Sequence, residues 1–220
     1  MEPTAQFFKS IKAGSLAEVK QMLHSQPKLI NARDEKGISA CMTAVYSHHE
    51  EIVNELLMLG FQPNFWEATA IGRSSWVAEL LNHDETLLDK YSADGFTALG
   101  LAAFFGKKDV LEILVSRGAD VNLAAKNPMQ VRPIHSAVAH NNPVVAMQMA
   151  ELLIENGADL NVAQSGGWTP MHQAAAHGQV EMVKLLLLFD ADKNSRSDDG
   201  RTPLDMALQG QHAGVAELLR

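Results

Sequence analysis

The side chains in this sequence that first suggest metal binding or nucleophilic chemistry are nine histidines and one cysteine, Cys41. Zinc sites use three or four cysteine, histidine or carboxylate ligands that converge on the ion. The run HHEEIV, residues 48–53, does not have the H-E-x-x-H spacing that places two histidines on one helix face. No cysteine or aspartate accompanies His140 and His177 as a further ligand. We therefore expect no metal ion and no cofactor.

Two other patterns of catalytic chemistry are incomplete. The glycines of SGG, residues 165–167, are not followed by the G-K-[ST] of a phosphate-binding loop. No serine, histidine and aspartate set stands out as a nucleophile with its base, so we expect no enzyme. A single cysteine cannot build a disulfide framework, which fits a reducing compartment, and we expect a cytoplasmic protein.

The composition is that of a soluble globular chain, with 46% hydrophobic and 20% charged residues. The formal net charge is −8 and no block of basic residues is present, so we do not expect nucleic acid as a partner. The N-terminal residues mix charged and polar side chains and lack the apolar run of a signal peptide. No stretch approaches the ~18 apolar residues of a membrane span. We therefore expect no membrane association.

The strongest pattern in the chain is an internal repeat. Residues 94–122, DGFTALGLAAFFGKKDVLEILVSRGADVN, align with residues 166–194, GGWTPMHQAAAHGQVEMVKLLLLFDADKN. A third copy lies within residues 132–161 and a fourth begins at 199–208. These residues resemble the ankyrin repeat, whose pattern is D-x-x-G-x-T-P-L-H-x-A-A-x-x-G-H, followed by an apolar helix and by G-A-D-V-N.

The resemblance implies an all-α fold, an ankyrin-repeat solenoid of about seven helix–turn–helix units with short β-hairpin fingers. Each unit cannot bury its apolar faces alone, and stacking buries them. We expect one domain over residues 1–220, with the hairpin missing from the first and third units. The expected units are residues 5–33, 34–64, 65–91, 92–126, 127–163, 164–196 and 197–220.

Individual residues of the repeat have physical roles. Pro170 is expected in the first turn of a helix, where no N–H is needed. Gly178 tolerates the left-handed turn that ends this helix, and small Ala174 lets neighbouring helices approach closely. In the ankyrin pattern His135 and His172 stand where the ring bonds neighbouring backbone. Cys41 stands at a buried position, where its thiol is inert.

Two departures from the pattern are informative. The histidine position recurs after 24 residues between Met42 and Trp66, whereas the other full steps are 33 to 37 residues, so the third unit has no room for a hairpin. We expect the Trp66 indole to be largely buried and to fill the space left by Gly100 one unit later. The fifth unit is four residues longer, about one helical turn, and we place that turn in the helix that begins after Asn142.

The resemblance also places a set of side chains on the concave side of the solenoid. The two residues before the turn glycine, the residue after the histidine position and the hairpin tips face that groove. Phe104 and Phe105 belong to it, although either ring could instead pack over the gap of the missing finger. The residues expected to contact a partner are Tyr46, Ile71, Phe96, Leu101, Phe104, Phe105, His140, Trp168, Gln173 and His177.

The function that follows is a non-enzymatic scaffold, expected to be a monomer, that binds a partner protein through its concave groove. Exposed aromatic clusters with polar surroundings are typical of binding hot spots. The alternative is a regulatory protein that responds to a small molecule or a metal, with a pocket at the shortened third unit beside Trp66. The sequence leaves this alternative open.

Overall fold

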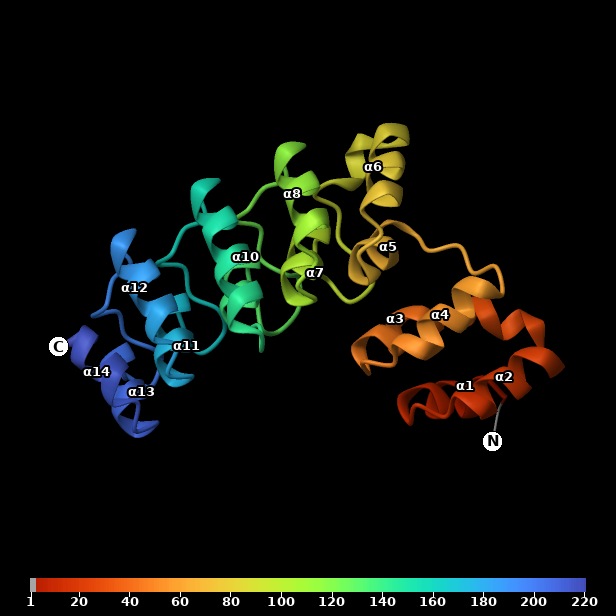
Figure 1. Ribbon diagram of the computed structural model, residues 1–220, viewed down its shortest axis with the longest axis horizontal. Helices are drawn as coiled ribbons and strands as arrows, with labels where there is room; N and C mark the ends of the chain where they lie inside the picture. Colours follow the sequence, from red (N-terminus) through yellow and green to blue (C-terminus); the bar gives the residue numbers. More distant parts are fainter. Residues whose placement is uncertain (1–2) are drawn as a thin grey trace.

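The computed structural model describes residues 3–220, which form fourteen α-helices and two short 3-10 helices without any sheet. The helices follow one another as seven antiparallel pairs in a curved row (Figure 1), which confirms the expected all-α solenoid. In each pair we call the first helix inner and the second outer. The pairs are α1 (Pro3–Lys12) and α2 (Leu16–Ser25), α3 (Ala40–Tyr46) and α4 (Glu50–Met58), α5 (Phe65–Ile71) and α6 (Ser74–His83), α7 (Ala98–Phe104) and α8 (Lys108–Ser116), α9 (Pro133–Val138) and α10 (Pro143–Glu155), α11 (Pro170–Ala176) and α12 (Val180–Leu188), and α13 (Pro203–Gln209) and α14 (Ala213–Leu219).

Hydroxyl and amide side chains start most of the inner helices. The hydroxyl of Thr97 accepts a hydrogen bond from the Gly100 N–H at 3.1 Å and caps α7, and Thr169 and Thr202 cap α11 and α13 in the same way. Such a cap satisfies a backbone donor that the helix leaves unpaired and contributes about 1 kcal/mol. Short local signals therefore set where most inner helices begin.

The fingers are tight turns rather than extended hairpins. Single antiparallel bridges close three of them, at Arg33 with Ser39, Tyr91 with Thr97, and Gln164 with Trp168. The third unit has no such turn, as expected from its length. Its inner helix α5 begins instead with a capping box, in which Asn64 accepts from the Glu67 N–H at 3.0 Å and Glu67 accepts from the Asn64 N–H at 2.8 Å.

The second and fourth fingers close the gap that the third leaves. A Cβ built on Gly37 would lie 3.7 Å from the Cβ of Ala93, so the tips of these fingers are in contact. The Tyr46 hydroxyl at the end of α3 donates a hydrogen bond to the Asp94 carboxylate on the fourth finger. The missing finger therefore brings together two units that are not neighbours in the chain.

The outer helix of the fifth unit is longer than the others. Helix α10 has 13 residues, whereas α4, α8 and α12 have nine each. Asn142 caps it by accepting from the N–H groups of Val144 and Val145, and Pro143 occupies its first position. The predicted extra turn in this helix is confirmed.

The apolar interior is divided into two main cores. One core holds residues of α1 to α4 together with Phe61, and the other runs from α5 to α14. A small third cluster around Met42, Ala70 and Leu101 joins them. Figure 1 shows α1 to α4 set apart from the remaining helices, with the chain passing through the loop before α5. The two blocks therefore depend on this cluster for much of their apolar contact.

The expected relation between Trp66 and Gly100 is wrong. A Cβ built on Gly100 would lie 3.3 Å from the Thr97 hydroxyl and 3.7 Å from the Phe96 ring, with no Trp66 atom within 4 Å. Trp66 is only half-buried, and its indole N–H donates to the Lys90 carbonyl at 3.2 Å. Because the next finger folds over its own helix, Phe96 occupies the space that the sequence assigned to Trp66.

Candidate functional site

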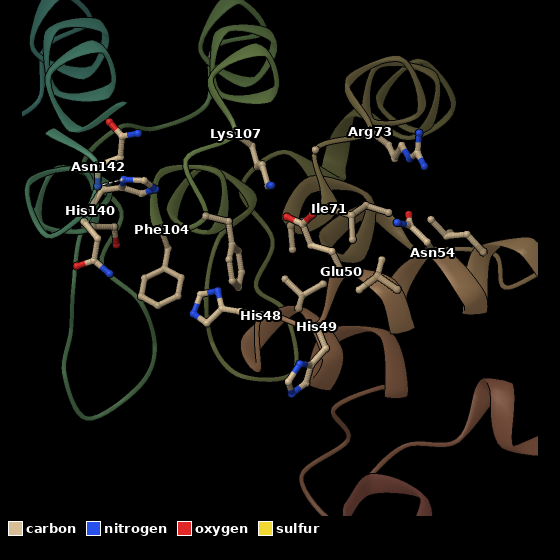
Figure 2. A pocket seen from close by; sticks show the side chains of 18 of the residues that line it. His48, His49, Glu50, Asn54, Ile71, Arg73, Phe104, Lys107, His140 and Asn142 are labelled. Carbon is tan, nitrogen blue, oxygen red and sulfur yellow. Dashed lines mark hydrogen bonds between the residues drawn. The ribbon is translucent and has the colours of Figure 1, made fainter. Parts of the chain in front are cut away.

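A hollow of about 630 Å³ opens where the inner helices of the second to fifth units end. We call it the inner hollow. Its lining side chains belong to residues 45–57, 70–73, 104–107 and 136–142, so four consecutive units contribute to it. The segments comprise inner-helix ends and the turns that follow them, and in the second unit the lining continues along α4 as far as Leu57. Figure 2 shows labelled side chains from all four units around this space.

Two aromatic side chains, Phe104 and Phe105, belong to the lining of the inner hollow. The Phe104 side chain is 45% exposed, and its ring lies 5.0 Å from that of Phe105 in an edge-to-face arrangement. Phe104 also lies 6.3 Å from the ring of Tyr46 and 6.4 Å from that of Phe96. Phe105 is half-buried and packs on the cluster around Leu101. The two adjacent phenylalanines thus differ: Phe105 mainly packs, and Phe104 faces solvent.

The residues expected at the groove fall into three groups. Ile71, Phe104, Phe105 and His140 line the inner hollow. Tyr46 and Phe96 stand behind Phe104 in the same aromatic cluster. The remaining residues do not line the hollow, and they are Leu101, Trp168, Gln173 and His177.

The expectation that Leu101 faces the groove is wrong. Its side chain is fully buried and belongs to the cluster that joins the two cores. The resemblance places this position on the concave side, but the rings of Phe96 and Phe105 pack against the same cluster and cover it. Leu101 therefore supports the surface without being part of it.

The more distant groove residues lie in the sixth unit. Trp168 is half-buried and its ring lies 6.4 Å from the imidazole of His172. His177 is exposed and its Nδ1–H donates to the Gln173 carbonyl at 2.8 Å. His140 accepts a hydrogen bond from the Asn142 N–H at 3.1 Å (Figure 2). His140 lines the hollow, whereas Trp168 and His177 lie outside it in the following unit.

The Tyr46 hydroxyl is already committed within the protein. Burial and the hydrogen bond to the Asp94 carboxylate raise the pKa of Tyr46 above its ordinary value. Its ring lies 5.3 Å from that of Phe105. Tyr46 therefore holds the aromatic cluster in place, and its hydroxyl is already bonded within the protein.

Two cations at the inner hollow were missed by the sequence reasoning. Arg73 and Lys107 are the residues before the outer helices α6 and α8, and both line the hollow. Within residues 3–220 neither side chain makes an ion pair or a hydrogen bond. A signal existed in the sequence, because both residues directly follow the turn glycines, Gly72 and Gly106.

The two buried histidines, His135 and His172, form hydrogen bonds that hold neighbouring units together. His135 accepts from the Arg132 N–H at 3.3 Å, and its Nε2–H donates to the Trp168 carbonyl at 3.2 Å in the next finger. His172 bonds Thr169 and the Arg201 carbonyl in the equivalent way. Burial lowers the pKa of both rings, to about 4 for His135. The expected backbone-bonding role of these histidines is confirmed.

The comparisons with known proteins identify the repeat. A family model described as ankyrin repeats (3 copies) matches residues 65–164 and 134–220. The chain belongs to the ankyrin repeat family. Ankyrin repeats generally mediate protein–protein interaction and are generally non-enzymatic.

Three relatives show how partial the similarity is. Tyrosine-protein kinase HTK16 from Hydra vulgaris is 35% identical over 57% of this chain and 16% of its own length. Tyrosine-protein kinase Shark from Drosophila melanogaster is 32% identical over 69% of this chain and 16% of its own length. SH3 and multiple ankyrin repeat domains protein 2 from Homo sapiens is 26% identical over 91% of this chain and 11% of its own length. The ankyrin chain thus spans only a small part of each relative.

No group of three or more His, Cys, Asp or Glu side chains converges in a way that would hold a metal ion among residues 3–220. Cys41 is fully buried, and burial together with the charge of Glu67 raises the pKa of its thiol to about 12. Over the same residues no helix combines the length and apolarity that crossing a bilayer requires.

Proposed function

We propose that this ankyrin chain is a non-enzymatic interaction module that holds a partner protein in its concave groove. The observation that carries the proposal is the exposed Phe104 ring, supported from behind by Phe105 and Tyr46 and set beside the inner hollow. Rigid aromatic side chains with exposed area are the commonest anchors of protein interfaces. The family supports the mode of action, since ankyrin repeats generally bind other proteins.

The proposal that the chain is not itself an enzyme rests on how its reactive side chains are used. His135 and His172 are buried with both ring nitrogens bonded to neighbouring groups. The Cys41 thiol is buried and protonated at neutral pH, so it is a poor nucleophile. The kinase relatives match this chain over only 16% of their length.

We also propose the setting in which the module works. A buried free thiol as the single cysteine fits a reducing compartment, and we place the chain in the cytoplasm. A net charge of −8 disfavours nucleic acid as the partner. We propose one domain that binds its partner as a monomer.

The test is a pull-down from native cytosol with the intact chain as bait. The Phe104→Ala bait should lose the partner that the unaltered chain captures. Leu188→Ala, which removes a 75% exposed side chain at the end of an outer helix, is the matched control and should retain it. Equal capture by Phe104→Ala and the unaltered chain would contradict the groove assignment.

A second candidate is the regulatory protein that responds to a small molecule or a metal. The volume of the inner hollow, about 630 Å³, lies in the range of small-molecule sites and favours it. Trp66 does not line this hollow, so the hollow is not the pocket expected beside the shortened third unit. Isothermal titration against a panel of metabolites and metal ions separates this candidate from the interaction module.

A further inference from the structure

The position after the left-handed residue that ends an inner helix, a glycine in most cases but His48 in the second unit and Gln211 in the seventh, has two different uses along this chain. In the second, sixth and seventh units it holds a side chain that bonds back to the preceding units. His49 bonds the Lys12 carbonyl at 3.2 Å, Gln179 bonds the Val138 carbonyl at 3.0 Å, and His212 bonds the Ala176 carbonyl at 3.0 Å. These bonds satisfy carbonyls at the ends of inner helices.

In the third and fourth units the same position carries a permanent cation. Arg73 and Lys107 replace the bonding side chains, and over the described residues neither forms an ion pair or a side-chain hydrogen bond. The Lys107 stem lies along Gly72, where a built Cβ would be 3.0 Å from Lys107 Cδ. Figure 2 shows both side chains at the inner hollow, with Phe104 on its other side.

The charge around the hollow is opposite to that of the chain. The lining contains these two cations and one carboxylate, Glu50, while the whole chain carries a net charge of −8. Helices α4, α6 and α8 begin beside the hollow, and none has a side-chain cap at its N-terminus. The positive ends of these helices and the negative ends of the inner helices, which also lie at the hollow, oppose each other, so the local excess of positive charge comes from Arg73 and Lys107. The surface is therefore apolar at Phe104 and positive at its rim.

We infer that the occupant of the inner hollow is an extended acidic segment of a partner protein, with a bulky apolar residue against Phe104 and carboxylates at Lys107 and Arg73. This inference rests on the proposed function and names the chemistry of its partner. The carboxylates form ion pairs with the two cations, which have no such partner within the described residues. The apolar residue covers the exposed Phe104 ring and removes it from water.

The spacing of the cations favours separate carboxylates over one phosphate. Arg73 and Lys107 stand in adjacent units, and packed helices lie roughly 8–10 Å apart. A phosphate is bound by basic groups that converge on it. An extended chain places side chains of one face roughly 7 Å apart, so Asp or Glu residues two or three positions apart reach both cations.

The test begins with random 12-residue peptides displayed on phage and selected on the full 220-residue chain. The selected peptides should be enriched in Asp and Glu within three positions of an aromatic or large aliphatic residue. Synthetic copies should then be titrated against variants. The double variant Arg73→Glu, Lys107→Glu should weaken binding by about tenfold or more, because attraction becomes repulsion.

Three further variants make the titration decisive. Lys184→Ala on α12, far along the chain from the hollow, should leave the affinity unchanged. Glu50→Gln should strengthen binding, because it removes the one carboxylate of the lining. Phe104→Ala should weaken binding of the same peptides. Raising the salt concentration should weaken binding to the unaltered chain and not to the double variant.

The outcomes separate this inference from the proposed function. If peptide affinity depends on Phe104 but is unchanged in the Arg73→Glu, Lys107→Glu variant, the occupant is not acidic, while binding in the groove still holds. A selection that yields no Phe104-dependent peptide would overturn both. Much tighter binding of phosphoserine in place of Asp or Glu would identify a phosphopeptide instead. Concentration-dependent dimers in sedimentation, abolished by Lys107→Glu, would identify a second copy of this chain as the occupant.

Discussion

At the scale of single residues, neighbouring positions on one inner helix have opposite roles. Leu101 is fully buried between the two cores, while Phe104, one turn later on α7, exposes 45% of its side chain. Both are large apolar residues, and only their packing partners distinguish them. Histidines of different units also differ in this way, because His135 is buried and His177 is exposed.

The first prediction compares Leu101→Ala with Phe104→Ala. Leu101→Ala removes a buried side chain and should lower the free energy of unfolding by about 2–5 kcal/mol. Phe104→Ala should lower the free energy of unfolding by well under half of that amount, because much of the Phe104 ring is already in contact with water. Urea titrations of both variants provide the measurement. Equal losses would mean that Phe104 is a packing residue.

The second prediction concerns pH and His135. Its folded pKa is lowered to about 4 from an ordinary value of 6.5, because burial disfavours the charged ring. The unfolded chain therefore takes up a proton first, and the stability present above pH 6.5 is lost as the pH falls toward 4. The loss from this group is up to about 3 kcal/mol.

The measurement is the free energy of unfolding of the unaltered chain and of His135→Gln at several pH values. The variant should be less stable at neutral pH and should show a shallower decline between pH 6.5 and 4. A decline that is identical in the two proteins would show that other groups cause it.

At the scale of elements, the turns between inner and outer helices decide how tightly the units stack. Gly106 has φ 65° and ends α7 directly against the next unit. A Cβ there would lie 2.5 Å from His140 Nε2 and 2.9 Å from Val145 Cγ1. Gly118 has φ 84° and follows α8, but a Cβ there would meet nothing within 4 Å.

The third prediction uses this pair of glycines. Gly106→Ala should destabilise by the strain of the left-handed backbone and by a further 1–3 kcal/mol or so from overpacking against His140. Gly118→Ala should cost only the backbone strain, about 1 kcal/mol. Thermal unfolding of both variants tests this, and a loss at Gly118→Ala as large as that at Gly106→Ala would contradict it.

At the scale of the whole molecule, the apolar interior is divided into two blocks between α4 and α5, where the unit without a finger begins. The core of α1 to α4 and the core of α5 to α14 share no residue, and the cluster at Met42, Ala70 and Leu101 joins them. The contact of Tyr46 with Asp94 ties the same blocks on the finger side. Since the aromatic surface and the inner hollow lie at this junction, motion between the blocks would reshape the groove.

The fourth prediction is that the two blocks open separately. Repeat arrays lose cooperativity where the interface between neighbours is weak. Native-state hydrogen exchange should show residues 7–61 exchanging together at a lower free energy than α7 to α12. Leu101→Ala should widen that difference, because it weakens the joining cluster. One uniform level of protection along the chain would contradict the division.

The sequence by itself determined the repeat, the family and the place of several helix ends, because these follow from short signals. Thr97, Thr169 and Asn142 cap helices within a few residues of themselves, and the 24-residue step predicted the absent finger. The extra turn of α10 could be read from four additional residues. Each of these features depends on contacts between residues close in the chain.

Only the tertiary structure decided which groove positions are exposed. The burial of Leu101 against Met42 and Ala70 and the bond from Tyr46 to Asp94 both arise between units on either side of the missing finger. They depend on how far the second and fourth units close over that gap. Arg73 and Lys107 were visible in the sequence, but their place in the lining of one hollow depends on the stacking of four units, which no local pattern encodes.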